Sequence, residues 1–370
     1  MTIPSPLLAR PGAVAVEGGT VAAHYGDPLR EQRLLAEVAG LVDRSDRDVL
    51  IVPGADRLSW LHSLTSQHLE RLADRAGTEA LVLSPHGHVE HHLVLTELGG
   101  TTWVDVEPGT GAELLAFLDR MRFMLRVEPA LVTEKWAVLS LVGPSAAGVL
   151  AAVELPVPDG VAPLVGGGWI RRMPAIGDGA LVFDLLVPRP AVEVVTDALL
   201  AAGAGLAGVD AYEALRVEAR RPRFGVDSDH RTIPNELEWL TTAVHLEKGC
   251  YRGQETVARV HNLGRPPRRL VLLHLDGVSE ALPEPGTPVL AGAREVGRVG
   301  TVVRHHELGV VALALVKQSV QPGTVLTVGG STAAIDADDV PAGPDDTRAA
   351  ARERVRAVRS ATIPPKVTRS

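Results

Sequence analysis

The residues best suited to chemistry lie in one short run, Lys248 to Glu255, with the sequence KGCYRGQE. The run contains Cys250, the only cysteine of the 370-residue chain. If the backbone here is extended, Lys248, Cys250 and Arg252 point to one face, because alternate side chains share a face. Two cations beside a thiol favour the thiolate and lower its pKa, so this spacing predicts a reactive cysteine. The alternative is a buried, inert thiol beside a turn.

A second group of residues with chemical potential is a set of four closely spaced histidines, His86, His88, His91 and His92. Val89 to Leu95 is expected to form a strand. Apart from Glu90, no carboxylate or thiol accompanies the histidines at a characteristic ligand spacing. Zinc sites normally combine three or four converging ligands, so we expect no metal site.

Length and composition limit the classes of protein that fit. A chain of 370 residues with 45% hydrophobic residues suggests two or three domains. The net charge of −8 argues against a broad nucleic-acid-binding surface. One cysteine excludes an intramolecular disulfide framework and an iron–sulfur cluster held only by cysteines of one chain. No apolar run approaches the ~20 residues of a membrane span, and the N-terminus does not resemble a signal peptide, so we expect a soluble cytoplasmic protein.

The elements that must position these residues are a mixture of helices and short strands without a regular alternation. Asp27-Pro28 predicts a helix start, and helical spacing continues to Leu41. Further helices are expected at 111–121, 144–153, 190–202 and 209–219, and strands at 48–52, 81–83, 89–95, 103–106, 136–142, 169–172 and 180–187. After Arg268, short β-rich runs separated by turns predict a small barrel. This order favours an α+β fold. We predict two α+β subdomains within 1–265, approximately 1–130 and 131–265, a barrel at 268–340 and a mobile tail at 341–370.

The run KGCYRGQE, followed by Thr256-Val257-Ala258-Arg259, resembles the signature of YgfZ-type folate-binding proteins. They are relatives of the glycine-cleavage T-protein, an aminomethyltransferase, and act in iron–sulfur protein maturation. The resemblance implies a ring of two α+β subdomains and a C-terminal barrel around a folate channel. It implies that tetrahydrofolate or another reduced folate is bound, and that iron–sulfur assembly factors or client enzymes are the partners.

The resemblance also implies roles for individual residues. Pro234-Asn235-Glu236 matches a T-protein segment that contacts the pterin ring, so Glu236 is a candidate ligand. Signature residues are further candidates for the folate site: Lys248, Tyr251, Gln254 and Arg259. Cys250 is the candidate catalytic or redox-sensitive thiol.

The same resemblance separates two hypotheses about activity. His91 and His92 stand where the T-protein has a pair of aspartates, one of which assists attack by the folate nitrogen. Their loss argues against standard aminomethyl transfer, although histidine is itself an acid or base near neutral pH. We therefore favour a folate-binding protein that assists iron–sulfur cluster assembly or repair. The alternative is a folate-dependent one-carbon transferase or demethylase.

Overall fold

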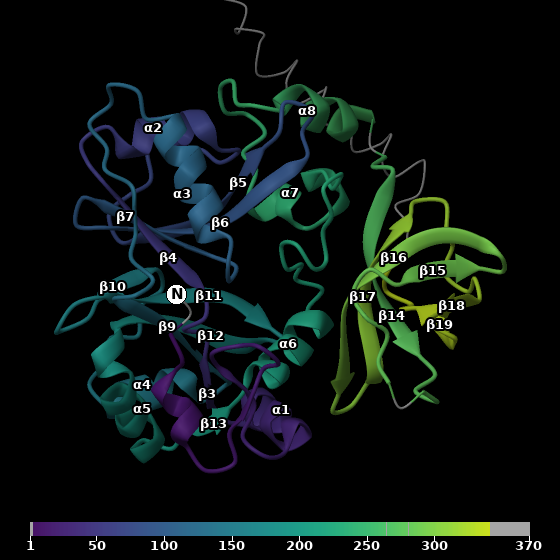
Figure 1. The fold of residues 1–370 in the computed structure, drawn as a ribbon, viewed down its shortest axis with the longest axis horizontal. Helices are drawn as coiled ribbons and strands as arrows, with labels where there is room; N and C mark the ends of the chain where they lie inside the picture. The colour runs from purple at the N-terminus through teal and green to yellow at the C-terminus, as the bar shows by residue number, and fades with distance from the viewer. Residues whose placement is uncertain (1–2, 264, 280, 341–370) are drawn as a thin grey trace, which may run out of the picture.

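The computed structural model describes residues 3–263, 265–279 and 281–340, and the predicted tail at 341–370 lies outside this part. The described chain forms two larger β-sheets, each covered by helices, and a closed β-barrel (Figure 1). The predicted α+β class with a C-terminal barrel is therefore confirmed. Within the described residues, no helix is long and apolar enough to cross a bilayer.

The first sheet has five strands in the order β5-β6-β7-β4-β8, and all its neighbouring strands are antiparallel. Its strands are β4 (Asp48–Pro53), β5 (Ala76–Leu83), β6 (Val89–Leu98), β7 (Thr101–Val106) and β8 (Ala130–Leu131). Helices α2 (Arg57–Leu64) and α3 (Gly111–Arg120) pack their leucines and aromatic residues against one face of it. The strands predicted at 81–83 and 89–95 thus belong to β5 and β6, which form one edge of this larger sheet.

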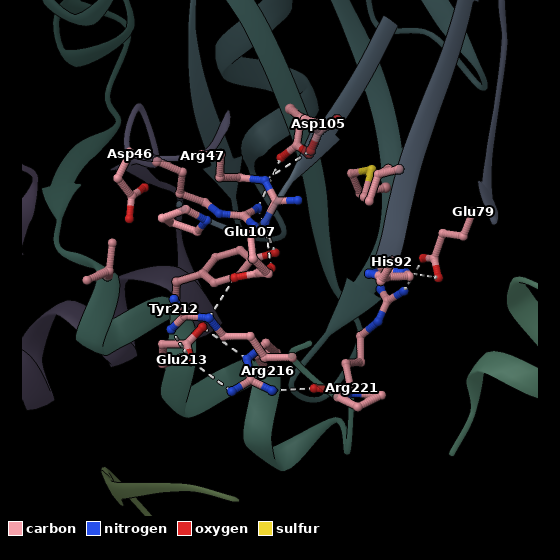
Figure 2. Close-up of a pocket in the computed structure, with 18 of the residues that line it drawn as sticks. Asp46, Arg47, Glu79, His92, Asp105, Glu107, Tyr212, Glu213, Arg216 and Arg221 are labelled. Atoms are coloured by element: carbon pink, nitrogen blue, oxygen red, sulfur yellow. Dashed lines mark hydrogen bonds and ion pairs between the residues drawn. The ribbon is translucent and has the colours of Figure 1, made fainter. Parts of the chain in front are cut away.

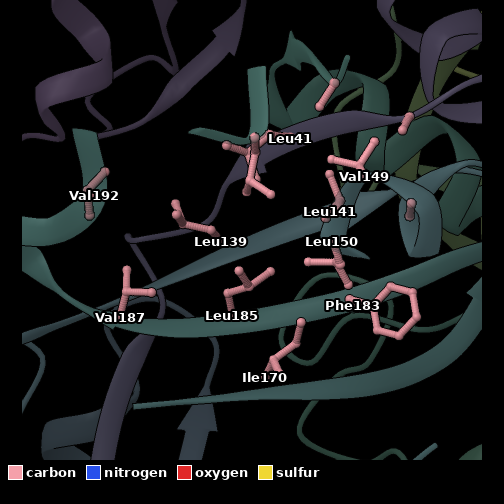
Figure 3. Packing of buried hydrophobic residues seen from close by; sticks show 14 of the residues in the cluster. Leu41, Leu139, Leu141, Val149, Leu150, Ile170, Phe183, Leu185, Val187 and Val192 are labelled. Carbon is pink, nitrogen blue, oxygen red and sulfur yellow. The ribbon is translucent and has the colours of Figure 1, made fainter. Parts of the chain in front are cut away.

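The second sheet has six strands in the order β10-β11-β12-β9-β3-β13. Its strands are β3 (Gly40–Asp43), β9 (Trp136–Val142), β10 (Val161–Pro163), β11 (Trp169–Ile176), β12 (Ala180–Pro188) and β13 (Gly205–Ala207). Helices α4 (Ala146–Ala152) and α5 (Val192–Ala201) cover one face, where leucine and valine side chains interdigitate (Figure 3). Helices α1 (Pro28–Glu37) and α6 (Val209–Glu218) pack on the other.

Two sequence-based expectations differ from this arrangement. Helix α1 begins at Pro28 with Asp27 as its cap, as predicted, but ends at Glu37. Residues 40–43 form β3 instead of extending the helix, and a Cβ atom on Gly40 would lie 2.4 Å from Leu35. Strand β3 pairs with β9 and β13, so the beginning of the chain belongs to the second sheet. The predicted subdomain boundary near residue 130 therefore does not separate the two sheets, because β3 precedes it and belongs to the second sheet.

The barrel closes in the order β14-β17-β16-β15-β18-β19. Its strands are β14 (Arg268–Leu275), β15 (Pro288–Ala291), β16 (Arg294–His305), β17 (Gly309–Lys317), β18 (Leu326–Val328) and β19 (Ser331–Ile335). Valine, leucine and alanine fill its interior. Between the sheets and the barrel lie α7 (Trp239–Thr242) and α8 (Gln254–Leu263) (Figure 1). Shorter elements complete the fold: β1 (Val14–Ala15), β2 (Ala22–His24), and 3-10 helices at Pro6–Ala9, Arg189–Ala191 and Pro234–Glu236.

The barrel is attached to α6 through a buried polar contact at Asp227. Its carboxylate accepts hydrogen bonds from the backbone N–H of Thr301 in β16 (2.7 Å) and from Arg216 in α6 (2.9 Å). Gly300 leaves the space for this approach, because a Cβ atom there would lie 2.2 Å from an Asp227 oxygen. The attachment therefore depends on a position without a side chain.

We predict that Gly300→Ala lowers the free energy of unfolding by about 2 kcal/mol, because the methyl group overpacks a buried hydrogen-bonded carboxylate. Urea unfolding measures the effect. Gly148→Ala is the matched control: nothing lies within 4 Å of its added Cβ atom, and Gly148 is inside α4. The control is expected to be neutral or stabilising by up to about 1 kcal/mol. Equal stability of Gly300→Ala and the wild type would contradict the prediction.

Candidate functional site

A cavity with a volume of about 160 Å³ lies between the facing sides of the two sheets, with α6 and α7 closing its walls (Figure 2). A second hollow of about 390 Å³ adjoins it and shares five lining residues: Glu79, Val94, Arg171, Met173 and Thr242. Ligand pockets generally have volumes of about 300–1,000 Å³, so the adjoining hollows have the dimensions of a small-molecule site.

Arg171 of β11 lines this cavity and connects the two sheets. It lies 2.6 Å from Asp105 of β7 and 2.9 Å from Asp184 of β12, and all three side chains are at most 2% exposed. Burial alone would lower the pKa of Arg171, but the two carboxylates raise it, so the guanidinium stays charged. Removing Arg171 would leave Asp105 with Arg47 (3.0 Å) and Asp184 with only the longer contact to Arg44 (3.7 Å), and losing one partner of a buried ion pair typically costs about 3–5 kcal/mol.

A second set of charges comes from the turn between β3 and β4. Arg47 pairs with Asp105 (3.0 Å) and Glu107 (2.8 Å), while Arg44 stacks over the Tyr212 ring at 4.4 Å. Asp46 lines the cavity half-buried and makes no hydrogen bond or ion pair among the described residues. Burial raises the pKa of Asp46, an effect that Arg44 and Arg47 partly offset. Asp46 is therefore a carboxylate available to a ligand with N–H donors.

The opposite wall carries a histidine held between an aromatic ring and a carboxylate. His92 stacks on Trp239 with ring centroids 4.8 Å apart, and its Nε2 lies 3.2 Å from Glu79 (Figure 2). Glu79 also accepts a hydrogen bond from Thr242 (3.0 Å) and lies 3.4 Å from Arg221. These contacts fix the orientation of the His92 imidazole at the cavity wall. The Glu79 carboxylate is the hydrogen-bond partner for a proton on its Nε2.

The two neighbouring histidines of β6 do not act together. Successive side chains of a strand alternate between faces, so His91 points away from the cavity toward Phe117 and Phe224. Burial lowers the pKa of His91. Only His92 faces the cavity, and the predicted pair contributes one cavity residue.

The signature loop lies outside this cavity. Lys248 is buried, and its ammonium donates hydrogen bonds to the backbone carbonyls of His62, Thr65 (2.6 Å) and Gln67 (3.0 Å). Burial lowers the pKa of Lys248 to about 8. Lys248 thus ties the loop to the turn after α2, a role that its position beside the cysteine did not suggest.

The cysteine itself is exposed, as the reactive-thiol hypothesis requires. The expected pair of cations is not held at the thiol, however, because Lys248 binds carbonyls and Arg252 pairs with Glu90 at 3.1 Å. The loop from Lys248 to Tyr251 is neither strand nor helix, and α8 begins at Gln254. Alternation along a strand therefore does not describe these side chains.

The other predicted folate ligands have partners or positions outside the cavity. Glu236 is 1% exposed; it accepts two hydrogen bonds from Arg268 (2.8 and 2.7 Å) and one from the Ile233 N–H (3.2 Å). Tyr251 is buried in an apolar cluster, which raises its pKa to about 12. Gln254 donates to the Lys248 carbonyl at 3.4 Å, and Arg259 is exposed on α8. None of the four lines the cavity.

The residues that dominate the cavity were not predicted from the sequence. Asp105, Arg171 and Asp184 each interrupt an otherwise largely apolar strand with a buried charge. Such isolated charges in strands were the available signal, because a buried charge requires a partner. Arg44, Asp46 and Trp239 gave no comparable signal, since their positions depend on contacts between distant segments.

Comparison with known proteins places this architecture among aminomethyltransferases. Residues 15–160 match the GCVT N-terminal domain, and residues 268–342 match the CAF17 C-terminal beta-barrel domain. An aminomethyltransferase of Moorella thermoacetica is 30% identical over 342 residues, 86% of this chain and 88% of the relative. One from Thermus thermophilus is 30% identical over 283 residues, 74% of this chain and 78% of the relative.

The crystal structure of glycine cleavage system aminomethyltransferase T from Bartonella henselae has the same fold. Its TM-score is 0.78 at 21% identity, over 89% of this chain and 94% of that chain. The fold is thus that of the T-protein class. With its relatives of 30% identity, the chain belongs to the aminomethyltransferase family, and it carries a C-terminal barrel of the CAF17 type.

The pH dependence of stability tests the contacts of Glu79. Burial would raise its pKa, but His92, Arg221 and Thr242 lower it from 4.5 to about 2. The charged contacts therefore stabilise the fold above pH 4.5, and that contribution is lost as pH falls toward 2. We predict that the wild type loses roughly 3 kcal/mol more than Glu79→Gln over this range, as measured by urea unfolding. Parallel profiles for the two proteins would contradict the assignment.

Proposed function

We propose that the protein binds a reduced folate in the central cavity and assists iron–sulfur cluster assembly or repair in client enzymes. The observation that carries the folate part is the cavity wall itself, where His92 stacks on Trp239 opposite the half-buried carboxylate of Asp46. Membership in the aminomethyltransferase family and the CAF17-type barrel support the proposal.

The cavity chemistry fits a pterin. A pterin presents a 2-amino group and an adjacent ring N–H, and a carboxylate accepts both in charge-assisted hydrogen bonds. Asp46 has no competing partner among the described residues, whereas Glu236 already accepts from Arg268 and from backbone. We therefore assign the pterin contact to Asp46 and keep Glu236 as the competing assignment.

Titration with tetrahydrofolate under anaerobic conditions tests this assignment by calorimetry. We expect Asp46→Asn to weaken binding about ten-fold or more, because charge-assisted hydrogen bonds worth ~1.5–3 kcal/mol are lost. Glu236→Gln is the comparison variant and is expected to bind like the wild type. Loss confined to Glu236→Gln would move the pterin contact to that residue, and no saturable binding by the wild type would overturn the folate proposal.

The iron–sulfur part of the proposal rests on Cys250. The thiol is exposed at the edge of a loop that is anchored by buried neighbours, Lys248 and Tyr251. One thiol cannot hold a cluster alone, because clusters are generally held by four protein ligands. We propose that Cys250 acts as a redox-sensitive thiol or transient ligand, and that a partner protein supplies the remaining ligands.

A cell that lacks its own equivalent of this protein provides the test. We expect the wild-type chain to restore the activity of iron–sulfur enzymes, and Cys250→Ser to restore much less at equal protein level. An enzyme without a cluster serves as the internal control and is expected to be unaffected. Full restoration by Cys250→Ser would remove the thiol from the function.

The alternative function is a folate-dependent one-carbon transferase or demethylase. The observation in its favour is the His92–Glu79 pair at the cavity wall, since a histidine held by a carboxylate is a suitable acid or base. The absence of aspartates at positions 91 and 92 argues against standard aminomethyl transfer. Turnover of a one-carbon folate by the purified chain, lost in His92→Phe, would favour this alternative.

A further inference from the structure

A group of potential metal ligands lies at the end of α2, outside the cavity lining. His62 is in the last turn of α2, and His68 and Glu70 follow in the connection to β5. One ligand atom from each of the three side chains lies within 4.8 Å of the others. These three residues are distinct from the histidines at 86–92, for which no metal site was predicted.

We propose that His62, His68 and Glu70 bind a divalent first-row transition-metal ion of the Zn²⁺ or Fe²⁺ class. Two imidazoles and one carboxylate form a ligand set used by catalytic zinc sites and by non-haem iron sites, with coordination positions left for water or another ligand. The oxygen-rich shells that Ca²⁺ and Mg²⁺ require are not provided by this set. The proposal does not depend on folate binding.

The geometry needs only a modest adjustment to accept an ion. The His62 and His68 rings meet edge to face with centroids 4.8 Å apart. Tetrahedral zinc with bonds of about 2.0 Å places ligand atoms about 3.3 Å apart, so ligand atoms that lie up to 4.8 Å apart must approach by up to about 1.5 Å. His62 and His68 are half-buried and Glu70 is exposed, which leaves their side chains room for this movement.

Neighbouring contacts both favour and oppose the ion. His62 Nδ1 accepts a long hydrogen bond from the Leu69 N–H (3.2 Å), and metal binding to this ring replaces or weakens that bond. The Lys248 ammonium is nearby and repels a cation, although its hydrogen bonds go to backbone carbonyls. Glu70 supplies the compensating negative charge.

Two features connect the proposed site to the signature loop. The His245 ring packs against His68 with centroids 5.4 Å apart, which places a further imidazole beside the ligand set. Lys248 holds the backbone of the same turn that carries His62 and His68, and the His245 N–H donates to the Ser66 carbonyl at 3.0 Å. An ion at this turn would therefore be bound next to the loop that exposes Cys250.

Calorimetry with Zn²⁺ on the metal-free full-length protein tests the proposal. We expect one saturable site per chain, no saturable binding of Mg²⁺ at the same concentrations, and at least about ten-fold weaker Zn²⁺ binding in His68→Ala and in Glu70→Gln. The matched control is His86→Ala/His88→Ala, which removes two histidines whose rings also pack together, at 6.2 Å. Its affinity is expected to equal that of the wild type.

Two further comparisons keep the test decisive. Glu70 is exposed, so Glu70→Gln is expected to fold normally even if His68→Ala is unstable. Cys250→Ser is expected to bind Zn²⁺ with unchanged affinity. Wild-type-like affinity in Glu70→Gln, loss of the site in the His86/His88 control, or loss in Cys250→Ser would each overturn the proposed ligand set.

Discussion

The buried guanidinium of Arg171 is the constraint on which the central region depends. Its two carboxylate partners belong to different sheets, so the ion pairs hold the sheets together at a fixed separation. Beside this network the sheets meet directly through apolar residues, including Val49, Trp169 and Leu186. The apolar contact brings the layers together, and the charges prevent complete closure, because six cavity arginines and their carboxylates cannot all be buried in an apolar interface. A polar cavity at the centre is the physical result.

Local patterns were sufficient to predict many of the elements. Asp27 accepts hydrogen bonds from two N–H groups at the start of α1, as a cap should, and the strands predicted at 81–83 and 89–95 lie within the paired strands β5 and β6. The failures involve contacts between distant parts of the chain. Strand β3 is separated by almost a hundred residues from its partner β9, and no local pattern assigns it to that sheet. The order of strands in the barrel is likewise fixed by long-range pairing, including that of β14 with both β17 and β19.

The signature residues illustrate why residue type alone is an incomplete guide to a site. Lysine beside cysteine suggested electrostatic activation, but Lys248 satisfies three buried carbonyl groups instead. Gly253 has a φ of +80°, and a Cβ atom there would lie 2.5 Å from the Ser84 carbonyl oxygen, so this glycine lets α8 begin against the β5–β6 turn. Much of the signature thus builds the loop, and only Cys250 is left as its exposed nucleophile. Asp105 and Asp184, by contrast, carried a signal, because each is the only charged residue of its strand.

One continuous segment connects the cavity with the exposed thiol. Trp239 and Thr242 line the cavity, the Ala243 carbonyl accepts a hydrogen bond from Ser66, and Lys248 is fixed to the same turn after α2. A ligand that displaced His92 from Trp239 would therefore act on the segment whose far end carries Cys250. Because Lys248 and Tyr251 are buried, that end of the segment is anchored and cannot move freely. The segment that lines the cavity thus continues directly into the loop that exposes the thiol, although Cys250 itself does not line the cavity.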